Sequence, residues 1–156
     1  MLKKYKDHVE ERLQQGIPPL PLNAEQVADL VELLKSPPAG EEEFILDLIK
    51  NRTPAGVDPA AYVKAAFLTA LAKGETSSPL IDKKLATELL GTMLGGYNVE
   101  SLIKLLKDEE VGAIAADGLS KTLLMFNAKH EVIELAAENE NARSEEHTSE
   151  LQSQPD

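Results

Sequence analysis

The sequence predicts an all-α protein built from stacked antiparallel helix pairs. Apolar residues recur at spacings of three and four in segment after segment, aromatic residues account for only 4% of the chain, and runs of β-branched residues are short. Stretches containing glycine or proline divide the chain into about seven or eight segments, each suited to a helix of roughly 10 to 16 residues. Short connections between helices of this length favour antiparallel neighbours over a single four-helix bundle.

The first three expected helices have clear start and stop residues. The first spans residues 2–15 and ends at Gly16, and the proline-rich segment 17–22 then crosses in an extended conformation. The second begins at a capping box formed by Asn23 and Gln26, and the third begins at three consecutive glutamates, which favour the positive end of a helix dipole. The residues expected on the buried sides of these helices are Leu2, Tyr5, Val9, Leu13, Val27, Leu30, Val31, Leu34, Phe44, Ile45, Leu48 and Ile49.

The middle of the chain predicts two further helices. Asp58 as N-cap, followed by a proline at the first helical position, fixes the start of a helix over residues 59–73, which stops at Gly74. Asp82 caps the next helix, and the Gly95–Gly96 pair is expected to end it. The buried residues expected here are Val63, Phe67, Ala70, Leu71, Leu85, Leu89 and Met93.

The last part of the body carries the most regular apolar stripe. Asn98 is expected to cap a short helix that ends in a charged turn at 107–110, and the helical period then continues unbroken over 111–126. Asn127 interrupts it before a final helix from about residue 129. Helix pairs of roughly 35 to 45 residues match a HEAT-like, α-solenoid-like stack. The buried residues expected here are Val99, Leu102, Ile103, Leu106, Val111, Ile114, Ala115, Gly118, Leu119, Thr122, Leu123, Phe126, Val132, Leu135 and Ala136.

Composition excludes several classes of function. Sixteen basic against 27 acidic residues give a net charge of −11, which repels phosphate backbones and anionic lipid, so neither nucleic acid nor a membrane is expected as a partner. No apolar run approaches the roughly 20 residues that cross a bilayer, and the start of the chain lacks the apolar stretch of a signal peptide, so a cytoplasmic protein is expected. The absence of cysteine excludes disulfides, thiolate catalysis and cysteine-ligated metal sites from this stretch.

The motif search predicts no catalytic, cofactor-binding or metal-binding residue. Glycines within 91–96 lack the preceding strand and the Gly-Lys-Ser/Thr ending of a phosphate loop, which favours a helix end. Ser101 and Lys104 have the spacing of a serine–lysine pair, but its companion motifs are missing. Gly118 lies on an apolar helical stripe, and this indicates close helix packing rather than the sharp turn of a nucleophilic serine.

Metal-ligating residues are not grouped in a recognisable pattern. The three histidines, at positions 8, 130 and 147, lack the close spacing of a helical two-histidine metal site. His8 and His130 lie beside acidic residues and are expected on solvated surfaces. Glutamates 41–43 are expected to be a solvated helix start rather than a cation site.

Several strings of residues resemble the N-terminal domain of the aconitate hydratase B family, the bacterial bifunctional aconitases and 2-methylisocitrate dehydratases. The resemblance runs from residue 1 to about residue 137, and its matches are long and occur in the family's order. The strings that carry it are Leu30–Lys35, Pro37–Phe44, Gly56–Asp58, Ala61–Ala65, Ala72–Glu75, Glu88–Met93, Gly95–Asn98 and Leu123–Phe126.

The resemblance implies a HEAT-like fold, in agreement with the helix pairs above. It also implies that the chain is the N-terminal part of a tricarboxylic acid cycle lyase, which interconverts citrate and isocitrate through cis-aconitate. In this family a [4Fe-4S] cluster held by three cysteines binds substrate and polarises the departing hydroxyl. Since this chain has no cysteine, it is expected to hold no cofactor and no catalytic residue. The expected partners are the missing catalytic domains of the same protein, and a second copy in a homodimer.

The end of the chain departs from the family. Residues 143–153 resemble the translation of a common sequencing-library adapter. Residues 143–156 are therefore expected to form a non-native, disordered tail that follows a helical domain over 1–142.

Two functions from different classes remain open. In the first, the chain is a non-catalytic protein-interaction domain of aconitate hydratase B. In the second, it is an independent helical-repeat adaptor that binds partner proteins and has no enzyme attached. The coding sequence beyond residue 142 separates them, because an in-frame aconitase body supports the first function and a natural stop supports the second.

Overall fold

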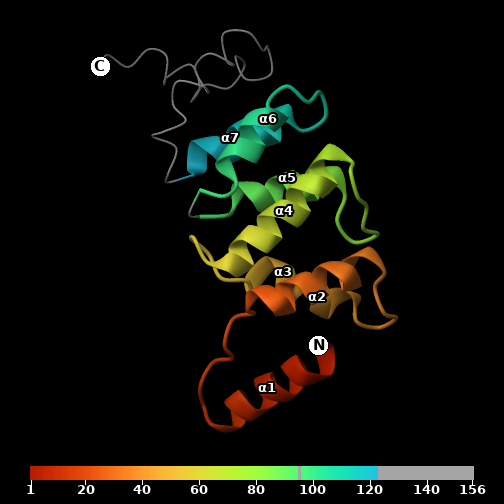
Figure 1. The fold of residues 1–156 in the computed structure, drawn as a ribbon, viewed down its shortest axis with the longest axis vertical. Helices are drawn as coiled ribbons and strands as arrows, with labels where there is room; N and C mark the ends of the chain where they lie inside the picture. The colour runs from red at the N-terminus through yellow and green to blue at the C-terminus, as the bar shows by residue number, and fades with distance from the viewer. Residues whose placement is uncertain (95, 123–156) are drawn as a thin grey trace, which may run out of the picture.

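The computed structural model describes residues 1–94 and 96–122. All regular secondary structure within these residues is helical, which confirms the predicted all-α class (Figure 1). The predicted core positions from Leu123 onward, the final helix from about residue 129 and the domain boundary at residue 142 lie outside the described residues. The helices of the described part are α1 (Leu2–Gln14), α2 (Ala24–Lys35), α3 (Glu42–Asn51), α4 (Pro59–Lys73), α5 (Lys83–Gly91), α6 (Val99–Leu105) and α7 (Gly112–Lys121).

The helices follow one another as layers along the longest axis of the molecule (Figure 1). α1 lies at one end, and the pairs α2 with α3, α4 with α5, and α6 with α7 follow in chain order. α4 packs on α2 and α5 packs on α7, so each pair is joined to the next through one apolar helix face. This arrangement is compatible with the predicted stack of helix pairs.

Side-chain caps fix three of the predicted helix starts. The Asn23 side chain accepts from the Gln26 amide at 2.8 Å, and the Gln26 side chain accepts from the Asn23 amide at 2.9 Å, so the predicted capping box is confirmed. Asp58 and Asp82 cap α4 and α5, each accepting a backbone amide hydrogen, at 2.8 and 2.7 Å. Each cap stabilises its helix by about 1 kcal/mol.

α4 is the central helix, and its buried face is wider than the sequence predicted. Phe67 and Leu71 lie in the core as predicted, whereas Val63 and Ala70 lie at its edge. The prediction assumed one partner face, but α4 packs against both α2 and α5 and therefore buries side chains over a broad arc. The buried residues that the prediction missed are Ala60, Ala61, Lys64, Ala65, Leu68 and Ala72.

α1 buries less than predicted, because it lies at the end of the stack. Tyr5 is buried, but Leu13 is 65% exposed, so its assignment to the core is wrong. The linker after α1 returns along the side that carries Tyr5 and His8, where the Tyr5 hydroxyl donates to the Leu20 carbonyl at 2.7 Å. The last turn of α1, with Leu13, is left uncovered.

Two helices end earlier than predicted. α5 ends at Gly91 rather than at the Gly95–Gly96 pair, and the Thr92 hydroxyl donates at 2.8 Å to a carbonyl of the last turn. The apolar period over 111–126 predicts one continuous helix, but α7 ends at Lys121 and Thr122 is extended, with φ −78° and ψ 126°. The apolar periodicity correctly identified the buried side of the chain as far as Thr122. It did not reveal that the helix ends at Lys121, because an extended residue such as Thr122 can keep its side chain in the core.

Asn98 occupies the N-cap position of α6 but does not cap it, so this part of the prediction is wrong. Its side chain is fully buried and points back to the preceding helix pair. The amide nitrogen donates to the Leu90 carbonyl at 2.7 Å and to the Met93 carbonyl at 3.2 Å, and lies 3.4 Å from the Thr122 hydroxyl. Asn98 thus joins the end of α5 to the end of α7.

Asn98→Ala is expected to lower the free energy of unfolding by about 2 kcal/mol, because two buried carbonyls lose their hydrogen-bond donor. Urea unfolding followed by circular dichroism measures this. The matched control is Asn51→Ala, which removes an exposed hydrogen bond of 2.7 Å between Asn51 and Asp47. This substitution is expected to lower the free energy of unfolding by less than about 0.5 kcal/mol. Equal losses of unfolding free energy in the two variants would contradict the role of Asn98 in joining α5 to α7.

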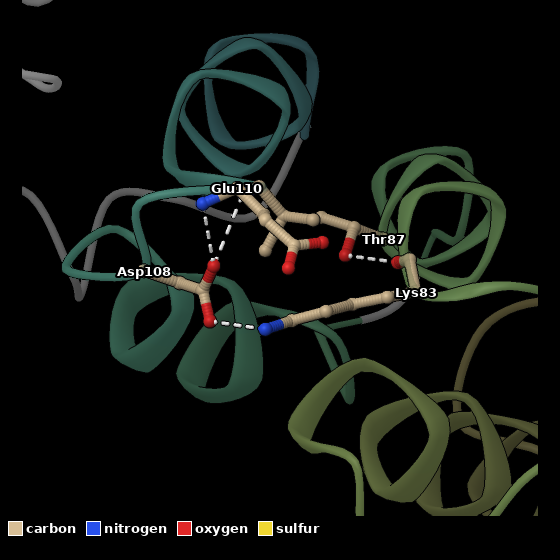
Figure 2. A network of polar contacts seen from close by, with 5 residues as sticks. Lys83, Thr87, Asp108 and Glu110 are labelled. Atoms are coloured by element: carbon tan, nitrogen blue, oxygen red, sulfur yellow. Dashed lines mark hydrogen bonds and ion pairs between the residues drawn. The ribbon is translucent and has the colours of Figure 1, made fainter.

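A polar network fastens the turn between α6 and α7 to the start of α5 (Figure 2). Lys83 of α5 forms a 2.6 Å ion pair with Asp108, and the other carboxylate oxygen of Asp108 accepts the amide hydrogens of Glu110 and Val111 at 2.8 and 3.2 Å. Their mutual hydrogen bond raises the pKa of Lys83 and lowers the pKa of Asp108. Asp108 is therefore held ionised, and it orders the turn that leads into α7.

Candidate interaction surface

The serine–lysine spacing does not form a catalytic pair in the structure. Ser101 accepts a 2.8 Å hydrogen bond from the Thr69 hydroxyl, which joins α6 to α4. Lys104 forms a 2.8 Å ion pair with Glu100 on the same helix. Both side chains are thus paired with other residues.

Two of the residues considered as metal ligands, Glu41 and His8, contact other residues of the protein. Glu41 forms a 2.6 Å ion pair with Lys6, whose ammonium also lies 5.0 Å from the centre of the Phe44 ring. His8 was expected to be solvated, but it is half-buried and its Nε2 atom accepts the Leu20 amide hydrogen at 3.0 Å. His130 and His147 lie outside the described residues, and residues 1–94 and 96–122 contain no group of three or more potential metal ligands.

The glycine on the apolar stripe marks a close helix crossing, as predicted. A Cβ atom added to Gly118 of α7 would lie 2.8 Å from the Cα of Gly91 in α5, and one added to Gly91 would lie 2.9 Å from the Cα of Gly118. No side chain can fit between these two backbones. Beside the crossing lies an open groove of about 460 Å³, bordered by Ile114, Asp117 and Lys121.

Four exposed apolar side chains belong to α4 and to the α3–α4 and α5–α6 loops. The two loops lie on the same side of the stack (Figure 1). We call these four side chains the tyrosine patch: Val57, Tyr62, Leu94 and Tyr97, which are 74%, 60%, 44% and 36% exposed. The two tyrosine rings meet edge to face with centres 5.4 Å apart, and the Tyr97 hydroxyl donates to the Val57 carbonyl at 3.2 Å. The Gly56 amide donates to the Leu94 carbonyl at 3.0 Å, so the two loops are fastened together beneath the patch.

A groove of about 450 Å³ runs from the tyrosine patch between α4 and α6. Its lining includes the small residues Ala65, Ala66 and Ala70 together with the two tyrosines. The charged residues that line it, Glu75 and Glu100, are both acidic. Tyrosine is enriched at protein interfaces because one ring offers a large apolar area and a polar end. The patch and its groove therefore resemble protein interfaces in their side-chain composition.

The sequence did not reveal this surface. The segment Gly95–Asn98 was identified only as one of the strings shared with the family, and Tyr62, Val57 and Leu94 were given no role. The sequence did indicate that Tyr62 is exposed, because this residue lies outside the apolar stripe of its helix. The joining of the two loops, which are far apart in the sequence, could not be predicted from periodicity.

Lys64 lies in the middle of the buried face of α4 and is only 6% exposed. Burial lowers the pKa of its ammonium from 10.5 to about 8. Its ammonium forms no hydrogen bond or ion pair with another residue in the described part of the chain. A charged ammonium in such surroundings opposes folding.

Comparison with known proteins agrees with the resemblance found in the sequence. Residues 4–146 match the family described as the aconitate B N-terminal domain. The chain belongs to this family. It is 65% identical over 136 residues to aconitate hydratase B of Pseudomonas aeruginosa and 60% identical over 144 residues to that of Escherichia coli. These alignments cover 87% and 92% of this chain, but only 16% and 17% of the two relatives.

A more distant member of the family is covered to the same extent. Aconitate hydratase B of Helicobacter pylori is 42% identical over 144 residues, covering 91% of this chain and 17% of that protein. The chain thus spans about one sixth of the length of the aconitate hydratases B that it matches. None of the helices in residues 1–94 and 96–122 combines the length and the apolar character needed to cross a bilayer.

The residues of this chain do not fit the iron–sulfur cluster that aconitase chemistry implies. Cluster irons are held by cysteine thiolates, and the sequence contains no cysteine. These residues alone therefore offer no thiolate ligand to such a cluster.

Proposed function

We propose that this chain is a protein-interaction domain of an aconitate hydratase B and that it takes no direct part in catalysis. The observation that carries the proposal is the family match over residues 4–146, in a chain that spans only about one sixth of its relatives. The exposed tyrosine patch supports it, since large apolar side chains gathered on a surface mark a contact with another protein.

The whole protein is proposed to interconvert citrate and isocitrate through cis-aconitate and to hydrate 2-methyl-cis-aconitate in the cytoplasm. Its [4Fe-4S] cluster would supply the open iron that binds substrate, and the domains beyond this chain would hold it. In this proposal the partners of the present chain are those catalytic domains, with a second copy of the protein as a further partner. Its net charge of −11 disfavours nucleic acid.

The purified chain is expected to show no hydration of cis-aconitate and no dehydration of citrate, even after anaerobic treatment with iron and sulfide. The physical reason is the missing thiolate ligands. Absorbance spectra and a coupled aconitase assay measure cluster formation and turnover. Full-length aconitate hydratase B of Pseudomonas aeruginosa, treated in the same way, is the positive control. A cluster band accompanied by turnover above the buffer blank would contradict the proposal.

A further inference from the structure

We propose that His8 is a pH-sensitive latch, which holds the proline-rich linker, residues 17–22, against α1 only while its imidazole ring is neutral. Protonation of the ring in mild acid releases the middle of the linker and lets water reach the Tyr5 side chain beneath it. This inference goes beyond the proposed function and does not depend on it.

The linker has few backbone hydrogens with which to hold its place. Three of its six residues are prolines, which have no amide hydrogen, so only Ile17, Leu20 and Leu22 can donate. The amides of Ile17 and Leu22 donate to backbone carbonyls, at 3.0 and 2.8 Å. The amide of Leu20 donates instead to the Nε2 atom of His8, at 3.0 Å. Within residues 17–22, the central amide is therefore the one whose acceptor changes charge near neutral pH.

The contact requires one form of the His8 ring. A ring nitrogen that accepts a hydrogen bond carries no hydrogen, so the hydrogen of the neutral ring lies on Nδ1. Both nitrogens of a protonated imidazole are donors, so the charged ring turns an N–H group toward the N–H group of Leu20. Histidine is the side chain that changes charge between about pH 5 and pH 8. Mild acid therefore removes the acceptor of Leu20 and leaves the backbone carbonyls that hold the two ends of the linker unchanged.

The charged groups around His8 do not replace the lost contact. The linker itself carries no charged side chain. In the part of the chain that the structure describes, no carboxylate forms an ion pair or a hydrogen bond with His8, so protonation of the ring loses one partner and gains none. The charged residues on the elements that meet here are Lys4, Glu11 and Arg12, within about one turn of His8 on α1, and Asp47 and Arg52 from α3 and its end, which act electrostatically on Tyr5 with opposite signs.

The latch is coupled to the core through Tyr5. The rings of Tyr5 and His8 lie one turn apart on α1, with centres 5.7 Å from each other. The Tyr5 hydroxyl donates to the Leu20 carbonyl at 2.7 Å, so the two side chains hold the carbonyl and the amide of a single linker residue. The Tyr5 side chain is only 2% exposed. A movement of Leu20 away from His8 therefore also loosens the hydroxyl contact and admits solvent to a buried ring.

The test follows hydrogen exchange of the linker amides by NMR in the full chain, at about pH 7.5 and about pH 5. Each rate is expressed as a protection factor, relative to an unstructured peptide at the same pH, which removes the intrinsic effect of pH on exchange. The protection factor of the Leu20 amide is expected to fall at least about fivefold in acid, as the loss of one hydrogen bond predicts. The Leu22 amide, whose acceptor is a carbonyl, is the internal control and is expected to change by less than about twofold.

Two substitutions separate the acceptor from its charge. His8→Gln supplies a carbonyl oxygen that does not titrate, and His8→Phe keeps a ring but has no acceptor. In both variants the protection factor of Leu20 is expected to be independent of pH, and in His8→Phe it is expected to be at least about fivefold lower than in the parent at about pH 7.5. A fall in acid as large in His8→Gln as in the parent would overturn the inference, because another group would then cause it.

A second measurement needs no substitution and decides the question if a variant does not fold. The proton–nitrogen NMR spectrum of the histidine rings at about pH 7.5 reports which nitrogen of His8 carries the hydrogen, and Nδ1 is expected. A hydrogen on Nε2 would overturn the inference, since that atom could not then accept from Leu20. Equal protection of the Leu20 amide at both pH values in the parent chain would overturn it as well.

Discussion

Gly118→Ala is expected to lower the free energy of unfolding by about 3 kcal/mol, although alanine is the better helix former by about 1 kcal/mol. The new methyl group would lie 2.8 Å from the Cα of Gly91. A clash with backbone cannot be relieved by a change of rotamer, so α5 and α7 must move apart and lose packing along their contact. Urea unfolding of both proteins measures the difference.

The control for this substitution lies on the same helix. Ala113 of α7 is exposed, and Ala113→Gly is expected to cost only about 1 kcal/mol through helix propensity. Gly91→Ala should act as Gly118→Ala does, and the double variant should cost less than the sum of the two, because helices already separated by one methyl accommodate the second. A stabilised Gly118→Ala protein would show that the two helices are not in close contact.

Lys64→Met is expected to raise the free energy of unfolding at about pH 7 by up to about 3 kcal/mol. Methionine has a similar shape and removes the charge that the core must accommodate. The pKa of Lys64 is about 8 in the folded protein against 10.5 ordinarily, so the unfolded chain binds more protons between these values. The cost of the lysine is therefore present in full below about pH 8 and diminishes as the pH rises toward 10.5.

The pH dependence distinguishes this effect from a general gain in packing. The difference between Lys64→Met and the parent should shrink to about 1 kcal/mol at about pH 10, where the folded protein carries a neutral Lys64. Lys73→Met, an exposed substitution on the same helix, serves as the control and should change stability by less than about 0.5 kcal/mol at either pH. A difference for Lys64→Met that does not depend on pH would mean that its ammonium reaches solvent.

Local chemistry allowed most of the fold to be predicted. The capping box at Asn23, the aspartate caps at Asp58 and Asp82 and the left-handed Gly74, with φ 78°, each depend on a few neighbouring residues, and all four lie where the sequence indicates. The apolar periodicity also identified the buried sides of α2 and α3 and the close approach at Gly118. These features need no information about distant parts of the chain.

The features that the sequence did not reveal depend on contacts that reach beyond a single helix. Asn98 has the residue type and position of an N-cap, but acceptors eight and five residues earlier, at Leu90 and Met93, draw its side chain into the core. The tyrosine patch requires the α3–α4 and α5–α6 loops to meet, and Lys64 is buried because α4 has neighbours on two sides. Periodicity describes one helix face at a time and does not contain this information.

The position of α1 at the end of the stack affects the order in which the helices unfold. Helix α1 has one neighbouring layer, and much of its attachment consists of polar contacts from Tyr5, Lys6 and His8 to the following linker and to Glu41. The α4–α5 pair, by contrast, shares apolar faces with α2 on one side and with α6 and α7 on the other. Opening of α1 therefore exposes little of the core and requires less free energy than global unfolding. Under mild denaturation α1 is expected to become accessible to proteases while the layers from α2 to α7 still hold together.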